Sequence, residues 1–389
     1  MLGYIVVIVG MALWYWLCHK TKDTDHKKFL FGAAVLMTLF YGLRGINTGS
    51  DTISYVSMFY EDAAQPFSRL WEYMWEKKSP AYVLSEWLFY KIFPSAQLWF
   101  VATSAFFFFI FSDFIRKNSM DPFFSYFIFF TIFGTFQMTG IRQSCAMAVL
   151  MLAFEQMKNK KLFKFLLLIG LAYLFHKSAV VFLPFYFVGK RRITQLDIPV
   201  LSVALIAIYR NRSFLFDYIK SFTSYDYFEQ LNHGEPINFS IMIYATTVLA
   251  IVLSIVLIVK KRKEVLEPYR SNFQPRLGPN GHNQSAIRYV PENLIRDEVY
   301  RNKEIMVYCE YANAMILASL FMPLVAINGA VRRIVMYFAL FMVLLIPKAF
   351  REFIDGQLRN IVKIAFGAVL LYLLLSGVYG SSYSYDVFF

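Results

Sequence analysis

The stretch GIRQSCAMAVLMLAFEQMKNKKLFKFLLLIGLAYLFHKSAVVFLPFYF, residues 140–187, sets a pattern that recurs along the chain. Long apolar runs alternate in it with a basic segment, KNKKLFK (158–164), and with the polar triplet HKS (176–178). A bilayer span needs about 20 mostly apolar residues, and a helix satisfies its own backbone polar groups in lipid. The stretch therefore predicts membrane helices that reverse direction at the polar segments.

The composition extends this interpretation to the whole chain. Of the 389 residues, 58% are hydrophobic, 19% are aromatic and 42 are phenylalanine, which is typical of a polytopic helical membrane protein. The net charge of +13 lies mostly in short basic clusters between apolar runs. This is the pattern of cytoplasmic loops in membrane proteins, so we expect membrane lipids as partners and no nucleic acid.

The N-terminus and the cysteines carry no sign of processing or of a metal site. The first apolar run, residues 2–18, has no basic flank before it and no small-residue cleavage site after it, so we expect a retained span. Cys18, Cys145 and Cys309 lie in or beside apolar runs without metal-ligand spacing, and we interpret them as core residues.

Placing every basic cluster on the cytoplasmic side gives about twelve transmembrane helices, with both termini on the outer face. The predicted spans are 2–18, 29–43, 97–115, 122–139, 141–157, 162–176, 178–189, 195–209, 239–259, 306–327, 331–347 and 361–379. We therefore expect an all-α polytopic integral membrane protein, with residues 1–389 forming a single transmembrane domain.

The segment AYVLSEWLFYKIF (81–93) is apolar but short, and counting it as a span would place Arg116 and Lys117 outside. We expect it to be an outer-face interfacial helix, a position that suits Trp87 and Lys91. The predicted long loops are 44–96 and 210–238 on the outer face and the polar segment 264–305 on the cytoplasmic face.

This topology places the remaining conspicuous polar segments at the outer ends of spans. They are RGINTGSD (44–51), TGIRQS (139–144), FHKS (175–178), the 210–238 loop and NGAVRR (328–333). Arg142, Arg332 and Arg333 lie at these outer ends, although positively charged residues usually favour the cytoplasmic side. Charged residues kept at a membrane against that preference are functional candidates.

Arginines at the outer face suit the binding of a diphosphate, because a guanidinium offers paired donors to phosphate oxygens. The candidates for this role are Arg44, Arg142, Arg332 and Arg333. Either Asp51 or His176 can take the proton of an attacking hydroxyl, and the sequence does not choose between them. The candidates for sugar contact are Gln143, Tyr55, Tyr225 and Tyr227. Such a site suits a lipid-linked sugar whose tail lies in the bilayer.

Each candidate also has a structural alternative. Arg44 and Arg142 can be interfacial anchors whose side chains reach the headgroups. Asp51 can cap the helix that begins TISYVSMF (52–59). His176 can be a core histidine, and the pair Arg332-Arg333 (332–333) can belong to an ordinary loop.

The chain lacks the common nucleotide and metal motifs. Asp23-Thr24-Asp25 imitates the DxD motif of nucleotide-sugar transferases, but it lies in a short loop between two apolar runs. No P-loop, no HExxH and no GxGxxG after a strand occurs in the sequence. We therefore expect no metal and no other cofactor.

Three motifs together resemble the EpsG-like branch of the Wzy O-antigen and exopolysaccharide polymerases. They are YGLRGINTGSDTISYVSMF (41–59), the 140–187 stretch and NGAVRRIVMYFALFMVLLIP (328–347). The 140–187 stretch is the most specific, because Arg142-Gln143 opens one span and HKS separates the next two. The resemblance covers most of the chain, and the 264–305 loop looks like an insertion.

The resemblance implies a GT-C-like membrane glycosyltransferase that uses polyprenyl-linked donors and needs neither a nucleotide fold nor a metal. It implies a polymerase that joins undecaprenyl-diphosphate-linked oligosaccharides at the outer face of the bacterial cytoplasmic membrane. The products of such enzymes include capsule, exopolysaccharide and lipopolysaccharide. Flippase and chain-length regulator proteins of the same pathway are the implied protein partners.

Two other classes of function stay open. A membrane acyltransferase that modifies a glycan or lipid would also use a histidine near a span end, but its acyl donor is expected on the cytoplasmic side. A transporter or flippase for lipid-linked oligosaccharides is expected to have ionisable residues at mid-membrane and paired broken helices. In this sequence the charged residues lie at span ends, and no duplicated half is visible.

Overall fold

The computed structural model describes residues 2–20, 26–193, 197–223, 237–271, 302–325 and 331–376. Within these ranges the chain is helical and forms no strand, so the predicted all-α architecture is confirmed. The first helices are α1 (Leu2–Lys20), α2 (Lys27–Gly42), α3 (Thr52–Ala63), α4 (Phe67–Glu76), α5 (Pro80–Ile92), α6 (Ala96–Asn118), α7 (Pro122–Thr139), α8 (Ile141–Lys158) and α9 (Leu162–Phe175). The later ones are η1 (Lys177–Phe182), α10 (Phe185–Val188), α11 (Asp197–Arg210), α12 (Arg212–Thr223), α14 (Ile237–Ser271), α16 (Lys303–Val325), α17 (Val331–Ala339), α18 (Met342–Phe353) and α19 (Gly356–Leu375).

Local sequence signals fix where the central helices begin. Asp121 precedes α7 and its carboxylate accepts a hydrogen bond from the backbone N–H of Phe124 at 3.1 Å, while Pro122 occupies the first turn. Gly140 alone separates α7 from α8. The first turn of α8 therefore lies directly at the end of α7, and this places Arg142 and Gln143 at that end of the bundle.

Aromatic side chains form much of the core, which explains the phenylalanine content. Phe111 of α6 packs against Phe129 of α7 with ring centroids 4.6 Å apart. Phe154 of α8 packs edge-on against Phe341, between α17 and α18, at 4.8 Å. Pairs of this kind add about 0.5–1.5 kcal/mol beyond the burial of their area, so they help to hold helices of unrelated sequence position together.

One glycine permits a close contact between two helices in the first half of the chain. A Cβ atom at Gly42 would lie 2.7 Å from the Cα atom of Val101, so α2 and α6 meet backbone to backbone. Real Cβ atoms do not approach backbone atoms so closely. A side chain at Gly42 would therefore push the two helices apart.

Ionic contacts join several of the helix ends that carry the basic clusters. Lys363 of α19 pairs with Asp121 before α7 at 2.5 Å. Lys261 of α14 pairs with Glu352 of α18 at 3.2 Å and with Glu304 of α16 at 3.5 Å.

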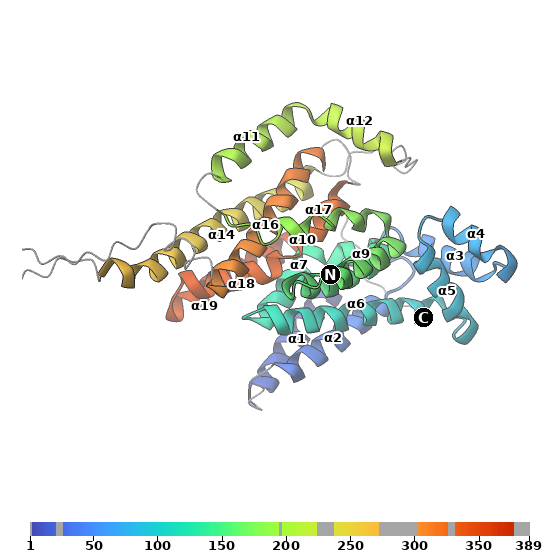
Figure 1. The fold of residues 1–389 in the computed structure, drawn as a ribbon. Coiled ribbons are helices and arrows are strands. Elements are labelled where there is room, and N and C mark those ends of the chain that lie inside the picture. The colour runs from blue at the N-terminus through green and yellow to red at the C-terminus, as the bar shows by residue number, and fades with distance from the viewer. Residues whose placement is uncertain are drawn as a thin grey trace, which may run out of the picture.

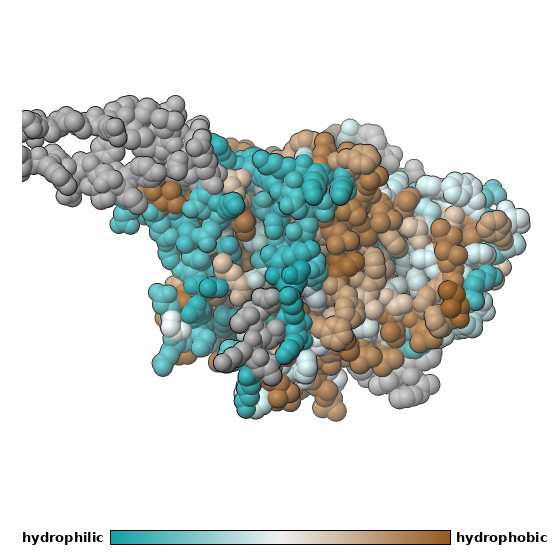
Figure 2. All heavy atoms as spheres, turned by 60° about the horizontal axis from the view of Figure 1, so that its bottom comes forward, coloured by the Kyte–Doolittle hydropathy of each residue, from teal (hydrophilic) through white to brown (hydrophobic). Residues whose placement is uncertain are grey.

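In Figure 1, α14, α18 and α19 extend toward the left-hand end of the bundle, and α3, α4 and α5 gather at the right-hand end. Figure 2 shows hydrophilic residues over the left part of one face, with a largely hydrophobic band beside them.

The described residues contain four helices long and apolar enough to cross a membrane, and a bent pair of helices gives a fifth candidate. The four are α1, α6, α16 and α19, and the bent pair is α17 with α18, at 42°. This supports a membrane protein. It does not confirm twelve spans or a GT-C architecture.

Several predicted spans differ in form from the helices observed. The helix at 162–176 is α9, with 14 residues. At 1.5 Å per residue it is about 21 Å long, shorter than the roughly 30 Å hydrocarbon core. The segment 178–189 divides into the 3-10 turn η1 and the short α10, and Pro184 between them lacks the N–H that a continuous helix requires.

Helices α3, α4 and α5, residues Thr52–Ile92, form a unit that we call the α3–α5 unit. Its own small core contains Leu70, Tyr73, Met74 and Val83. The predicted interfacial helix 81–93 corresponds to α5, which packs against α3, α4 and α9. In α4, Trp71 and Trp75 are exposed, so this helix also presents aromatic side chains outward.

Two predicted loops are described only in part. Helix α12 occupies the beginning of 210–238, and α14 continues through Ser271 into the segment 264–305. The remainder of both loops lies outside the described residues.

Candidate functional site

Four of the predicted site residues come together from three distant segments. Arg142 and Gln143 lie in the first turn of α8, His176 lies in the bend between α9 and η1, and Arg333 lies in the first turn of α17. The Gln143 side chain is 1% exposed, and its Nε2 donates a hydrogen bond to the carbonyl of Arg333 at 2.5 Å. The charges of Arg142 and Arg333 both act on His176. We call these four residues the arginine–histidine cluster.

The polar segment HKS is held by the local backbone and by a neighbouring helix. Helix α9 ends at Phe175, and His176 adopts an extended conformation with φ −155° and ψ 116°. Ser178 then forms a hydrogen bond with the hydroxyl of Tyr337 in α17, at 3.0 Å between the two oxygens. The bend therefore packs against the helix that carries Arg333.

The electrostatics of the cluster keep its histidine neutral. Burial, the charge of Arg333 and the charge of Arg142 lower the pKa of His176 from 6.5 to about 3. The imidazole is therefore uncharged near neutral pH and has a nitrogen that can accept a proton. An anion placed between the two guanidinium groups would offset their charge and raise the pKa of His176.

Arg142 also connects the cluster to the α3–α5 unit. Its Nη1 donates a hydrogen bond to the hydroxyl of Ser79 at 3.2 Å, and its Nη2 lies 4.0 Å from the sulfur of Met58. Ser79 is 2% exposed and immediately precedes α5. The α3–α5 unit thus packs against one of the arginines predicted to bind the diphosphate.

Arg44 has structural contacts of its own. Its guanidinium is 1% exposed, donates to the carbonyl of Tyr41 at 2.6 Å and to the hydroxyl of Thr52 at 3.2 Å, and lies 4.5 Å from the centre of the Phe100 ring. These contacts hold the bend between α2 and α3. The observed contacts show Arg44 supporting this bend. A role of Arg44 in binding diphosphate stays a prediction.

Asp51 and Tyr55 lie on the other side of the same bend. Asp51 stands at the N-terminal boundary of α3, but its side chain makes no capping hydrogen bond; it accepts one from the hydroxyl of Ser50 at 2.9 Å. Tyr55 is 5% exposed and donates to the carbonyl of Thr139 at 3.3 Å. Neither residue has a described contact with the arginine–histidine cluster. Their roles as base and sugar contact stay predictions.

The other predicted residues are placed less fully. Arg332 is half-buried beside Arg333 in α17. Tyr225 and Tyr227 lie outside the described residues, as do positions 328–330 of the NGAVRR motif.

The sequence interpretation missed two buried acids, one of which interacts with Arg142. Glu86 in α5 is 0% exposed and Asp62 in α3 is 3% exposed. The charge of Arg142 acts on Glu86. A single carboxylate within the apolar run 81–93 was the available signal, because an acid in such a run usually has a specific partner.

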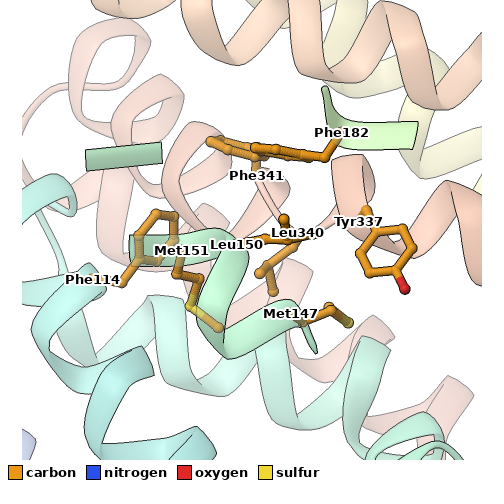
Figure 3. Close-up of a pocket in the computed structure, with 8 residues that line it drawn as sticks. All are labelled: Phe114, Met147, Leu150, Met151, Phe182, Tyr337, Leu340 and Phe341. Carbon is orange, nitrogen blue, oxygen red and sulfur yellow. The ribbon is translucent and has the colours of Figure 1, made fainter. Parts of the chain in front are cut away.

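A small apolar cavity lies deeper in the bundle. It has a volume of about 10 Å³ and is lined by Phe114, Met147, Leu150, Met151, Phe182, Tyr337, Leu340 and Phe341. Figure 3 shows the Phe182 and Phe341 rings side by side above the α8 side chains, with Tyr337 at one edge. The cavity has room for about one water, and a prenyl group would need these side chains to move.

The fold and the cluster define an all-helical membrane protein with arginines and a histidine gathered at helix ends. The sequence profile of the EpsG family matches residues 27–387, nearly the whole chain. The protein belongs to the EpsG family, which confirms the resemblance and indicates a membrane protein of the polysaccharide-polymerase type. No curated protein and no solved structure is significantly similar to the chain.

Proposed function

We propose that the protein is a glycosyltransferase that polymerises undecaprenyl-diphosphate-linked oligosaccharide units at the outer face of the bacterial cytoplasmic membrane. The observation that carries the proposal is the convergence of Arg142, Arg333 and His176 in a chain of the EpsG family. Two guanidinium groups beside a neutral imidazole match the needs of a reaction in which a diphosphate leaves while a hydroxyl loses its proton.

In the proposed reaction, a hydroxyl oxygen of the acceptor unit attacks the anomeric carbon of the growing glycan. The bond from that carbon to the diphosphate breaks, and undecaprenyl diphosphate leaves with the electron pair. Arg142 and Arg333 stabilise the negative charge that develops on the diphosphate. The proton of the attacking hydroxyl passes to His176, with Asp51 as the second candidate for that role.

The low pKa of His176 fits this sequence of events. In the empty site the two arginines oppose protonation of the imidazole. A bound diphosphate offsets their charge, so the pKa of His176 rises toward the range of an effective base. Proton acceptance is then favoured when the donor is present. Arg44 and Arg332 are secondary diphosphate candidates, and Gln143 positions Arg333 through its backbone carbonyl.

The test is polymerisation by the purified full-length protein in nanodiscs, supplied with lipid-linked repeat units extracted from a strain that lacks the gene. We expect Arg142→Ala and Arg333→Ala each to lower the rate by about 100-fold, the effect of removing one donor to a developing anion. His176→Asn should lower it by at least as much, and the exposed Arg69→Ala should leave it unchanged. Normal rates in all three site variants would refute the proposed site.

The deletion strain tests the class of function separately. A polymerase deletion should accumulate single lipid-linked units at the outer leaflet, and a flippase deletion should accumulate them at the inner leaflet. Glycan of normal length that lacks an acyl group would instead identify an acyltransferase.

A further inference from the structure

Two carboxyl groups are buried together inside the α3–α5 unit. Glu86 of α5 is 0% exposed, and Asp62 of α3 is 3% exposed. The two side chains interact with each other, and the hydroxyl of Tyr73 in α4 donates to Asp62 Oδ1 at 2.8 Å. Neither carboxyl oxygen of Glu86 has a hydrogen bond of normal geometry to the described residues. Tyr82 of α5 also interacts with the Glu86 carboxyl group, so each acid of the pair has a tyrosine beside it.

Two carboxylates in contact away from water cannot both stay ionised, because each charge disfavours the other and neither is solvated. Burial and the neighbouring Asp62 raise the pKa of Glu86 well above 4.5. The pair thus holds one shared proton and one negative charge.

A positive charge of the arginine–histidine cluster acts on this pair. Arg142 acts electrostatically on Glu86, and its Nη1 donates to Ser79, which directly precedes the helix of Glu86. Arg142 also acts on His176. The guanidinium therefore interacts electrostatically with both the buried acid pair and the proposed catalytic histidine.

We propose that the Asp62–Glu86 pair is the resting counterion that positions Arg142, and that the substrate diphosphate takes over this counterion role when it binds. The inference rests on the proposed function, and it adds positioning residues that act through Arg142. When the product diphosphate is to leave, the carboxyl pair competes with it for the guanidinium. The single negative charge of the pair thus limits how tightly diphosphate is held.

The shared proton gives the proposal a specific mutational signature. Glu86→Gln leaves Asp62 as the one acid of the pair, and Asp62→Asn leaves Glu86, so each single variant keeps one carboxyl group that can carry the negative charge. The double variant, Asp62→Asn with Glu86→Gln, removes both carboxyl groups and with them the negative charge of the pair. The matched control is Glu72→Gln with Glu76→Gln, two exposed acids of α4 in the same unit.

The experiment measures binding of undecaprenyl diphosphate to the full-length protein in nanodiscs, together with the polymerisation rate. We expect the two single variants and the matched control to bind within about threefold of wild type. The double variant should bind at least tenfold more tightly and turn over at least tenfold more slowly, because product release is slowed. A merely structural role would weaken binding instead of strengthening it. Unchanged or weaker binding by a folded double variant would overturn the inference.

The outcomes also separate this inference from the proposed function. If wild type does not bind undecaprenyl diphosphate, the proposed function itself fails. If wild type binds and Arg142→Ala does not, while the double variant binds as wild type does, the counterion role alone fails. Should the double variant not accumulate in the membrane, adding Arg142→Met must restore accumulation, since it removes the unbalanced cation. Failure to restore would count against the counterion role.

Discussion

Replacing Arg44 by alanine distinguishes its structural role from a role in binding substrate. The guanidinium is buried, and among the described residues it donates hydrogen bonds to Tyr41 and Thr52 and contacts the Phe100 ring. The acceptors are the carbonyl of Tyr41 and the hydroxyl of Thr52, which belong to the helices on either side of the bend. We expect Arg44→Ala to loosen this bend and to destabilise the fold before any direct effect on catalysis.

The size of the effect follows from these contacts. A hydrogen bond from a charged donor is worth about 1.5 kcal/mol or more, and two of them give about 3 kcal/mol. A desolvated contact with the Phe100 ring adds about 1–2 kcal/mol. The expected loss in free energy of unfolding is therefore about 4–5 kcal/mol for Arg44→Ala. Arg44→Lys keeps the charge but cannot make both hydrogen bonds at once, so we expect about half of that loss.

Unfolding by SDS in mixed micelles measures this loss, with polymerisation followed on the same preparations. The matched control is Arg69→Ala, because Arg69 is exposed and its contact with Glu76 is 3.9 Å long; we expect a change below about 0.5 kcal/mol. If Arg44→Ala unfolds as wild type does and still fails to polymerise, the structural reasoning is refuted. Arg44 would then act on the diphosphate, as the sequence predicted.

Three further changes test other parts of the structure. Gly42→Ala should destabilise the protein by about 1–3 kcal/mol, since its methyl group meets Val101, and SDS unfolding checks this. Gln143→Leu leaves the carbonyl of Arg333 without this donor, which should cost about 1–3 kcal/mol and lower the polymerisation rate; a normal rate would show that the contact does not position Arg333. The pKa of His176 is lowered from 6.5 to about 3, so protonation favours the unfolded chain. Its contribution to stability is therefore complete above pH 6.5 and declines by about 1.4 kcal/mol per unit below it. His176→Asn should remove that slope from unfolding measured between pH 7 and pH 5, and an unchanged slope would contradict the assigned pKa.

The candidate site was predictable where a polar or charged residue interrupts an apolar run. Arg142, His176 and Arg333 stand out in the sequence for this reason, and the structure brings them together. Glu86 gives the same signal, but its partner Asp62 lies 24 positions earlier in a mixed segment. No local pattern links the two residues, because the contact exists only once α3 packs against α5.

Arg44 and Asp51 are residues whose roles the sequence could not decide. Both residues stand at the end of an apolar run, so position along the chain cannot separate a buried support from a residue that faces a substrate. The decision depends on where Thr52 and Phe100 place their side chains around the guanidinium. Those positions follow from the packing of α3 and α6.

The sequence by itself determined that this is a helical membrane protein of the EpsG family, because hydrophobic run length, basic clusters and the three motifs are properties of neighbouring residues. It did not determine helix lengths such as that of α9, or the breaks at η1 and between α17 and α18. Tertiary structure alone decided that Arg142 interacts both with His176 and with the buried acid Glu86. The physical reason is that charge interactions depend on distance in space, and these residues come from segments that only the packed bundle brings together.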